Sequence, residues 1–254
     1  NTVEEFKTWS DKMYAEYYCI EEKLDGGSLS VDYVNGKLQR VLTRGAGDDG
    51  EDITRNAVKF KGIKQTLPTN YTGSLRAEVL LFANDFDAYN AEALANGWTV
   101  FKNQRNGANG LARRTNGDGV HHLRVLFYEQ IGMALERRFE RLGCLRKMLG
   151  LWTPWIASVK YDGAVRVYNE YQTAKRALLP YEIDGLVAKV DDVEHAETIE
   201  GALQKSISSN NPKSQIAWKF EAETRVTTLK SVSLDFGLGG RVTPVAELEA
   251  VKLG

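Results

Sequence analysis

The chain is poor in the residues that build covalent or thiolate-based frameworks. It contains only 2 cysteines among 254 residues, Cys19 and Cys144. Two cysteines are too few for a disulfide scaffold or a four-thiolate zinc module. We therefore expect two buried thiols in a reduced compartment.

The sequence also lacks a long apolar run and a strong charge of one sign. No stretch approaches the roughly 20 apolar residues that a membrane span needs, and the first residues lack the charged-then-apolar pattern of a secretory signal. The formal net charge is −1, so contacts with nucleic acid must come from local basic clusters rather than from a bulk field. These absences predict a cytoplasmic protein with no membrane partner.

What is present is enough apolar material for one large globular domain, with 43% hydrophobic and 26% charged residues. Thr2 and Glu5 have the spacing of a capping box, which predicts a helix over residues 3–18. Apolar residues alternate over 29–33, Asn35-Gly36 forms a two-residue turn, and the pattern predicts a return strand over 38–43.

Further elements follow without regular strand-helix alternation, which favours an α+β fold with antiparallel sheets rather than a doubly wound parallel sheet. The patterns predict helices over 84–96, 133–149 and 173–179. They predict strands over 75–82, 123–128, 185–190, 216–221 and 226–236, and a mixed, partly irregular segment over 191–212. The glycine-rich turn at 237–240 is the candidate domain boundary.

A Lys-x-Asp-Gly motif occurs twice, at Lys23 and at Lys160. A lysine is a nucleophile only when its amine is neutral, which requires burial or neighbouring cations. After Lys23 comes a hairpin and then the glycine-rich segment TRGAGDDGEDIT at 43–54, whose backbone N–H groups and arginine could meet an anion. Nothing comparable follows Lys160, so we interpret Lys160 as a solvent-facing turn residue.

Seven motifs in a single order give the sequence a specific resemblance. They are EEKLDG at 21–26, the segment at 43–54, SLRAEVLLF at 74–82, NQRNGANGLARR at 103–114, LRVLFY at 123–128, RALLPYEIDGLVAKV at 176–190 and IAWKF at 216–220. In this order they resemble the adenylation (nucleotidyltransferase) domain of NAD+-dependent DNA ligases. The resemblance implies an ATP-grasp-like nucleotidyltransferase fold over residues 1–238, and 239–254 resemble the start of an OB-fold domain.

The resemblance also implies roles for individual residues. Lys23 would attack the α-phosphate of NAD+, release nicotinamide mononucleotide and hold AMP until its transfer to a DNA 5′-phosphate. Glu21 would accept a hydrogen bond from the adenine amino group, and Glu78 would hold the ribose hydroxyls. Further nucleotide contacts would be Leu24, Arg44, Tyr128, Lys189 and Lys219. Orienting groups or contacts to nucleic-acid phosphate would be Asp25, Arg105, Arg113, Arg176 and Asp184.

Some of these roles remain open at the level of sequence. Lys219 is the favoured phosphate partner, whereas Lys189 fits either the base edge or a phosphate. Tyr128 fits either stacking on adenine or half-buried packing. NAD+ and Mg²⁺ are the implied cofactors, with AMP carried covalently on Lys23. No carboxylate cluster in the sequence assigns ligands to the metal.

The match is imperfect at loop and packing positions, where Ala46, Asp48, Asp49, Ala77, Gly107 and Asn109 depart from the usual family residues. These departures suggest a divergent member of the family, such as a viral one. Nicked DNA would be bound through domains outside this chain, and the OB fold and other ligase domains would be supplied in cis or by a second polypeptide. Rival interpretations are an ATP-dependent ligase or capping-type nucleotidyltransferase, and a catalytically silent adenylation-like scaffold.

Overall fold

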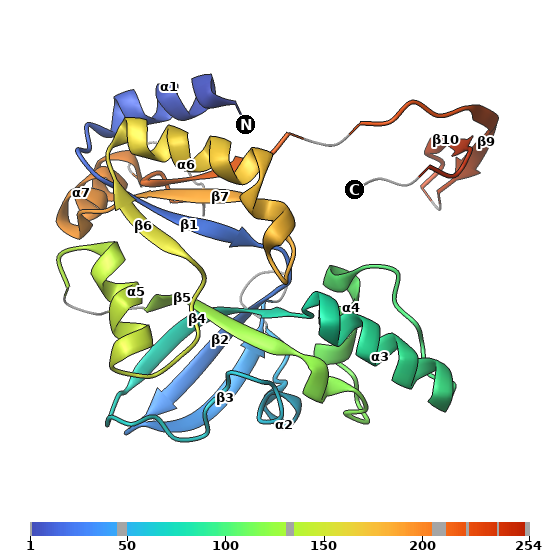
Figure 1. The fold of residues 1–254 in the computed structure, drawn as a ribbon, viewed down its shortest axis with the longest axis horizontal. Helices are drawn as coiled ribbons and strands as arrows, with labels where there is room; N and C mark the ends of the chain where they lie inside the picture. The colour runs from blue at the N-terminus through green and yellow to red at the C-terminus, as the bar shows by residue number, and fades with distance from the viewer. Residues whose placement is uncertain are drawn as a thin grey trace. The chain divides into compact units, whose positions relative to one another are not determined.

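The chain folds into two compact units, Asn1–Phe220 and Glu221–Gly254. The computed structural model describes residues 2–44, 50–130, 135–204, 212–221, 224–237 and 239–251. Residues 45–49 of the glycine-rich segment predicted to meet an anion therefore lie outside the described residues. The first unit contains two four-stranded sheets and the second a two-stranded sheet (Figure 1).

The first sheet of the larger unit carries the Lys-x-Asp-Gly motif of Lys23. Its strands are all antiparallel, in the order β6 (Ile156–Val159), β1 (Tyr18–Leu24), β7 (Ile183–Val190) and β8 (Gln215–Lys219). β1 is buried along most of its length because strands pair with both of its edges and the aromatic core formed with α1 and α6 covers one face. Lys23 therefore lies near the end of β1, which is one of the two central strands of this sheet.

The second sheet is also antiparallel and carries the larger hydrophobic core. Its order is β3 (Lys37–Thr43), β2 (Gly27–Val34), β4 (Gly73–Leu80) and β5 (Arg124–Gln130). The turn between β2 and β3 is the predicted one, since Asn35 and Gly36 both have positive φ, at 49° and 75°. The α+β class with antiparallel sheets is confirmed.

Helices flank both sheets (Figure 1). They are α1 (Val3–Met13), α2 (Thr54–Ala57), α3 (Ala83–Asn96), α4 (Gln104–Ala112), α5 (Arg138–Lys147), α6 (Tyr161–Thr173) and α7 (Val193–Gln204), with short 3₁₀ turns η1 (Val120–His122) and η2 (Lys175–Leu178). α1 and α6 pack on the first sheet through Phe6 and Tyr168, whose rings stack on Trp218 at centroid distances of 4.1 and 4.2 Å. No helix in the described ranges is both long and apolar enough to cross a membrane.

Several predicted boundaries are wrong. The capping box at Thr2 forms as predicted, but the first helix ends at Met13 because Tyr14 adopts a left-handed conformation with φ of 50°. The segment 191–212, predicted to be partly irregular, contains the helix α7, and most of 173–179 is a 3₁₀ turn. The predicted turn at Lys160 is instead the N-cap of α6, a helix that the sequence patterns missed together with β6.

The smaller unit is a hairpin of β9 (Leu229–Phe236) and β10 (Val242–Leu248). The larger compact unit ends at Phe220, and β9 pairs with β10 in a sheet of its own. The domain boundary at 238 stays a prediction. Every residue of both strands is exposed, including Phe236 at 75%. An isolated two-stranded sheet is marginally stable at best in water.

Candidate active site

A cavity of about 930 Å³ opens between the two sheets of the larger unit. Its volume lies in the range of small-molecule and cofactor sites. Most of the predicted site residues line it: Glu21, Lys23, Leu24, Asp25, Arg44, Glu78, Arg105, Arg113, Tyr128 and Lys189. The structure thus gathers residues from β1, β4, β5, β7 and α4, which are up to 168 positions apart in the sequence, around one hollow.

Lys23 lies opposite Gly185 of β7, and Gly185 lies opposite Lys219 of β8. A Cβ at Gly185 would lie 2.7 Å from the Cα of Lys219 and still nearer the carbonyl oxygen of Trp218. Only glycine therefore allows β8 to approach this closely. The absence of a side chain between them lets both lysines reach the same edge of the sheet.

Asp184 joins the two lysines. Lys23 Nζ donates to Asp184 Oδ1 and Oδ2 at 2.6 and 2.9 Å, and Lys219 Nζ lies 3.8 Å from Oδ2. The side chains of Lys23 and Asp184 are both 28% exposed, so a ligand can reach the amine although Asp184 fixes its position. One carboxylate thus faces two ammonium groups, and the site keeps an excess of positive charge where an anion can bind.

Glu21 and Lys189 form a buried ion pair deeper in the cavity. Lys189 Nζ donates to Glu21 Oε1 at 2.6 Å, and both side chains are almost fully buried. Burial acts to lower the pKa of Lys189, but the Glu21 and Glu129 carboxylates outweigh it and hold the pKa above its usual value. Glu21 Oε2 has no hydrogen-bond partner among the described residues. It is therefore a buried acceptor that lacks a donor.

Glu78 and Tyr128 lie on neighbouring strands of the second sheet. Burial raises the pKa of Glu78 to about 7, while a backbone hydrogen bond from Gly26 and the charge of Lys23 act in the opposite direction. Tyr128 shares a hydrogen bond of 3.1 Å with Ser28, and Lys189 Nζ lies 5.9 Å from the centre of its ring. Both residues line the cavity together with Glu21 and Lys23 of β1.

The predicted arginines occupy two places. Arg105 Nη1 lies 2.8 Å from Asp25 Oδ1 and Arg113 Nε lies 3.4 Å from Glu51 Oε2, both at the cavity rim with Arg44. Arg176 is separate from them, because it lines an adjoining hollow of about 350 Å³ that shares Asp25 with the main cavity. The side chains of Arg105 and Arg113 are 59% and 48% exposed, so a phosphate could displace their present partners.

Sequence reasoning missed the buried carboxylate next to the lysine. Glu22 accepts hydrogen bonds from Tyr171 Oη at 2.7 Å, Tyr181 Oη at 2.6 Å and the Trp155 amide at 3.0 Å. It is 3% exposed and fixes β1 against α6 and the loop before β7. Partners 133 to 159 positions away leave no local signal, so only the fold could reveal them. Asn109, which donates to the Gly26 carbonyl at 3.2 Å, was missed although it lies within a recognised motif.

Lys160 behaves as predicted for a residue outside the site. Its side chain is 62% exposed and Nζ lies 2.9 Å from Glu16 Oε1. It lies at the start of α6 and does not line the cavity. The two copies of Lys-x-Asp-Gly therefore have different surroundings, and only that of Lys23 contains converging cations and a hollow.

Comparisons with known proteins agree with the order of motifs. Curated relatives include the DNA ligases of Sorangium cellulosum, 36% identical over 92% of this chain and 32% of the relative, and of Fusobacterium nucleatum, 36% identical over 99% of this chain and 36% of the relative. The chain thus spans about a third of the length of the curated relatives that it matches. Two solved structures, Pmar-Lig_Pre and Pmar-Lig_PreS3, share the fold with a TM-score of 0.50 at 15% and 14% identity. They cover 96% and 97% of this chain, which in turn covers 51% and 55% of theirs.

The sequence model of one family matches residues 2–223, which is nearly the whole of the larger unit and a little beyond. That span contains each of the residues gathered at the cavity. With this match and relatives above 30% identity over most of its length, the chain belongs to the family of NAD-dependent DNA ligase adenylation domains.

Proposed function

We propose that Lys23 becomes covalently adenylated by NAD+. Lys23 Nζ attacks the α-phosphate, a P–N bond forms, the P–O bond to nicotinamide mononucleotide breaks, and the amine proton leaves toward Asp184, its hydrogen-bonded neighbour at 2.6 Å. The observation that carries the proposal is the position of this amine at a cavity of about 930 Å³, beside one carboxylate and a second lysine.

The cations around Lys23 suit the charge that develops during phosphoryl-type transfer. Such reactions depend on positioning and on preplaced positive charge. Lys219, which shares Asp184 with Lys23, would contact the α-phosphate once the nucleotide competes for that carboxylate. Arg44, Arg105, Arg113 and, from the adjoining hollow, Arg176 would bind the other phosphates of NAD+ or of DNA, where planar guanidinium groups give bidentate contacts.

The deeper wall would recognise the adenosine. Glu21 Oε2, buried and without a partner in the described chain, would accept a hydrogen bond from the adenine amino group. Glu78 would hold the ribose hydroxyls and Tyr128 would stack on the base. Leu24 would pack beside the nucleotide. Lys189, paired with Glu21 beneath the ring of Tyr128, fits a place at the base edge.

A magnesium ion would act chiefly through the nucleotide. In the described ranges no three carboxylate or imidazole groups gather beside Lys23. Mg²⁺ commonly uses one or two carboxylates and completes its shell with substrate phosphates and water, so Asp184 and Asp25 fit as supporting ligands only. The ion would neutralise part of the negative charge on the phosphates.

The test is the intact mass of the protein after incubation with NAD+ and Mg²⁺. We expect a gain of one AMP that is lost in Lys23→Ala and kept in Lys160→Ala, a matched control in the second Lys-x-Asp-Gly motif. An adduct from ATP instead of NAD+ would favour an ATP-dependent nucleotidyltransferase. If no adduct forms, protein purified in the adenylated state and mixed with nicotinamide mononucleotide should release AMP; failure of both directions would indicate a silent scaffold.

Sealing of a nick would need more than this chain. We propose that the remaining two thirds of the relatives' length corresponds to the OB fold and other domains that hold nicked DNA, in cis or as a second polypeptide. The net charge of −1 supports this division, because strong DNA binding requires an excess of phosphate-neutralising residues. A rate of nick closure by the chain alone equal to that of a complete ligase would contradict it.

A further inference from the structure

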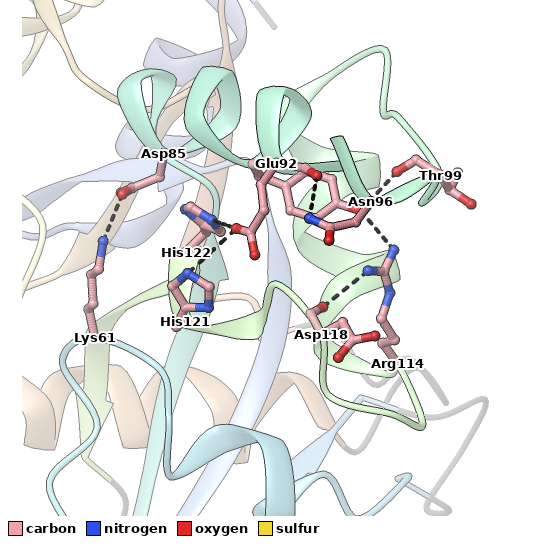
Figure 2. A network of polar contacts seen from close by, with 10 residues as sticks. Lys61, Asp85, Glu92, Asn96, Thr99, Arg114, Asp118, His121 and His122 are labelled. Carbon is pink, nitrogen blue, oxygen red and sulfur yellow. Dashed lines mark hydrogen bonds and ion pairs between the residues drawn. The ribbon is translucent and has the colours of Figure 1, made fainter. Parts of the chain in front are cut away.

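A group of potential metal ligands lies on the second-sheet side of the larger unit, apart from the nucleotide cavity. Glu92 on α3 and the adjacent His121 and His122 of η1 place their ligand atoms within 4.8 Å of one another. None of the three lines the cavity around Lys23. Figure 2 shows both imidazole rings turned toward the Glu92 carboxylate. From this arrangement we propose that Glu92, His121 and His122 bind a divalent transition-metal ion.

The distances fit a shared metal ion. Glu92 Oε2 lies 2.7 Å from His122 Nε2 and 3.7 Å from His121 Nε2. Ligands at about 2.0–2.2 Å from a metal are separated from each other by about 3–3.5 Å. The two observed distances lie on either side of that value, so an ion requires each ring to shift by less than about 1 Å.

The orientation of the two rings is unusual for neighbouring residues. Consecutive residues of a 3₁₀ turn point about 120° apart around its axis. Here the rings of His121 and His122 nevertheless lie side by side, with centroids 4.2 Å apart, and present the same nitrogen to one oxygen. A hydrogen bond to Glu92 accounts for His122 alone. His121, at 59% side-chain exposure, gains little from a contact of 3.7 Å unless a cation joins the group.

The surroundings neither fill the site nor repel a cation strongly. Lys61 binds Asp85, which lies two turns earlier on α3 than Glu92 (Figure 2). Arg124 binds the same carboxylate, and Arg114 donates to the Asp118 carbonyl and to Tyr89 Oη. Exposure of His121 leaves room for water to complete the coordination shell. Two imidazoles and one carboxylate with open positions suit Zn²⁺, Co²⁺, Ni²⁺ or Cu²⁺ better than Mg²⁺ or Ca²⁺, which prefer oxygen ligands.

A bound ion would tie α3 to η1 and so close the segment between them. That segment contains α4, whose Arg105 and Asn109 line the nucleotide cavity. The ion would bind the folded state only, so it would raise the thermal stability of the chain. At a hundredfold excess over the dissociation constant, we expect the melting temperature to rise by roughly 5–10 °C.

The experiment titrates the purified chain with Co²⁺ and records visible absorption, then repeats the titration with Zn²⁺ by calorimetry. We expect one ion per chain, bands of nitrogen and oxygen coordination, and no thiolate charge-transfer band. His121→Ala should weaken binding at least tenfold, and Glu92→Gln, which keeps a hydrogen bond to His122 but removes the anion, should weaken it about tenfold. Circular dichroism checks that both variants fold.

The chain offers a matched control, because its third histidine, His195, lies on α7 and hydrogen-bonds the Met13 carbonyl at 2.8 Å. His195→Ala should bind the ion as the unchanged protein does. Equal affinity in His121→Ala and the unchanged protein, a thiolate band that follows Cys144, or no binding up to millimolar metal would each overturn the proposal.

Discussion

Glu78→Gln tests how strongly the cavity between the two sheets disfavours a negative charge on Glu78. Burial raises the pKa of Glu78 from 4.5 to about 7. Because the pKa is higher in the folded state, the neutral acid stabilises the fold fully below about pH 4.5, and this contribution is lost as the pH rises through 7. The gap between 4.5 and about 7, at about 1.36 kcal/mol per pKa unit, corresponds to about 3 kcal/mol. Glutamine has nearly the same shape and never ionises, so it avoids the loss.

Urea unfolding at pH 5 and pH 8.5 measures the effect. We expect the stability of Glu78→Gln relative to the unchanged protein to increase by about 2–3 kcal/mol between these two pH values. Asp87→Asn, at an exposed carboxylate of α3, serves as the control and should show nearly the same difference at both. Parallel pH profiles for Glu78→Gln and the unchanged protein would refute the reasoning, because they would mean that the Glu78 carboxylate is solvated.

The same substitution separates stability from the proposed role in catalysis. If the carboxylate accepts hydrogen bonds from the ribose hydroxyls, the rate of adenylation should rise with pH through about 7 as Glu78 loses its proton. The Glu78→Gln variant should then be adenylated more slowly than the unchanged protein and should be more stable at high pH. Its adenylation rate should not rise as the pH passes through 7. An unchanged rate and pH profile would remove Glu78 from the nucleotide site.

Three further substitutions test the packing and charge around Lys23, each by urea unfolding. Glu22→Leu leaves the buried Tyr171 hydroxyl, the half-buried Tyr181 hydroxyl and a backbone amide without their acceptor, and should destabilise the chain by about 3 kcal/mol. Gly185→Ala pushes a methyl group against the backbone of β8, and should cost about 1–3 kcal/mol and lower the adenylation rate by displacing Lys219. Lys189→Met isolates the buried carboxylate of Glu21 and should cost about 3–5 kcal/mol, most of which Glu21→Gln in the same chain should restore.

The sequence predicted best where a local rule fixes the structure. The Asn35-Gly36 turn needs two positive φ angles, which few residues adopt, and the Thr2 capping box satisfies backbone donors within one turn. α6 was missed because Gly163 and several β-branched residues weaken its helical propensity, while burial of Tyr168 and Tyr171 against the first sheet outweighs that weakness. Long-range packing, which the sequence does not display, decided these elements.

For the site, the motifs predicted which charged residues gather but not which of them pair. The rim arginines and both lysines of β7 and β8 were expected near Lys23, and all line or adjoin the cavity. The pairing of Lys189 with Glu21 and the network around Glu22 depend on strand register. A shift of one residue would turn Lys189 to the other face of the sheet, and no single-sequence pattern encodes that register.

Taken together, the charged groups in and beside the cavity keep hydrogen-bonding capacity that a nucleotide could use. Asp184 serves two lysines, one oxygen of Glu21 has no donor within the described chain, and Glu78 holds its proton up to about pH 7. The raised pKa of Glu78 means that its carboxylate lowers the stability of the protein above about pH 7, whereas Asp184 and Glu21 are each paired with a lysine. NAD+ would offer its phosphates to the two lysines beside Asp184, its adenine amino group to Glu21 and its ribose hydroxyls to Glu78. Removing the Glu78 carboxylate should therefore raise the stability of the protein at high pH while weakening its affinity for NAD+. Removing Glu21 should instead lower stability, because it would leave Lys189 buried without its carboxylate. The opposite signs of the two effects at Glu78 distinguish it from a residue kept for packing, such as Glu22, whose loss should lower both.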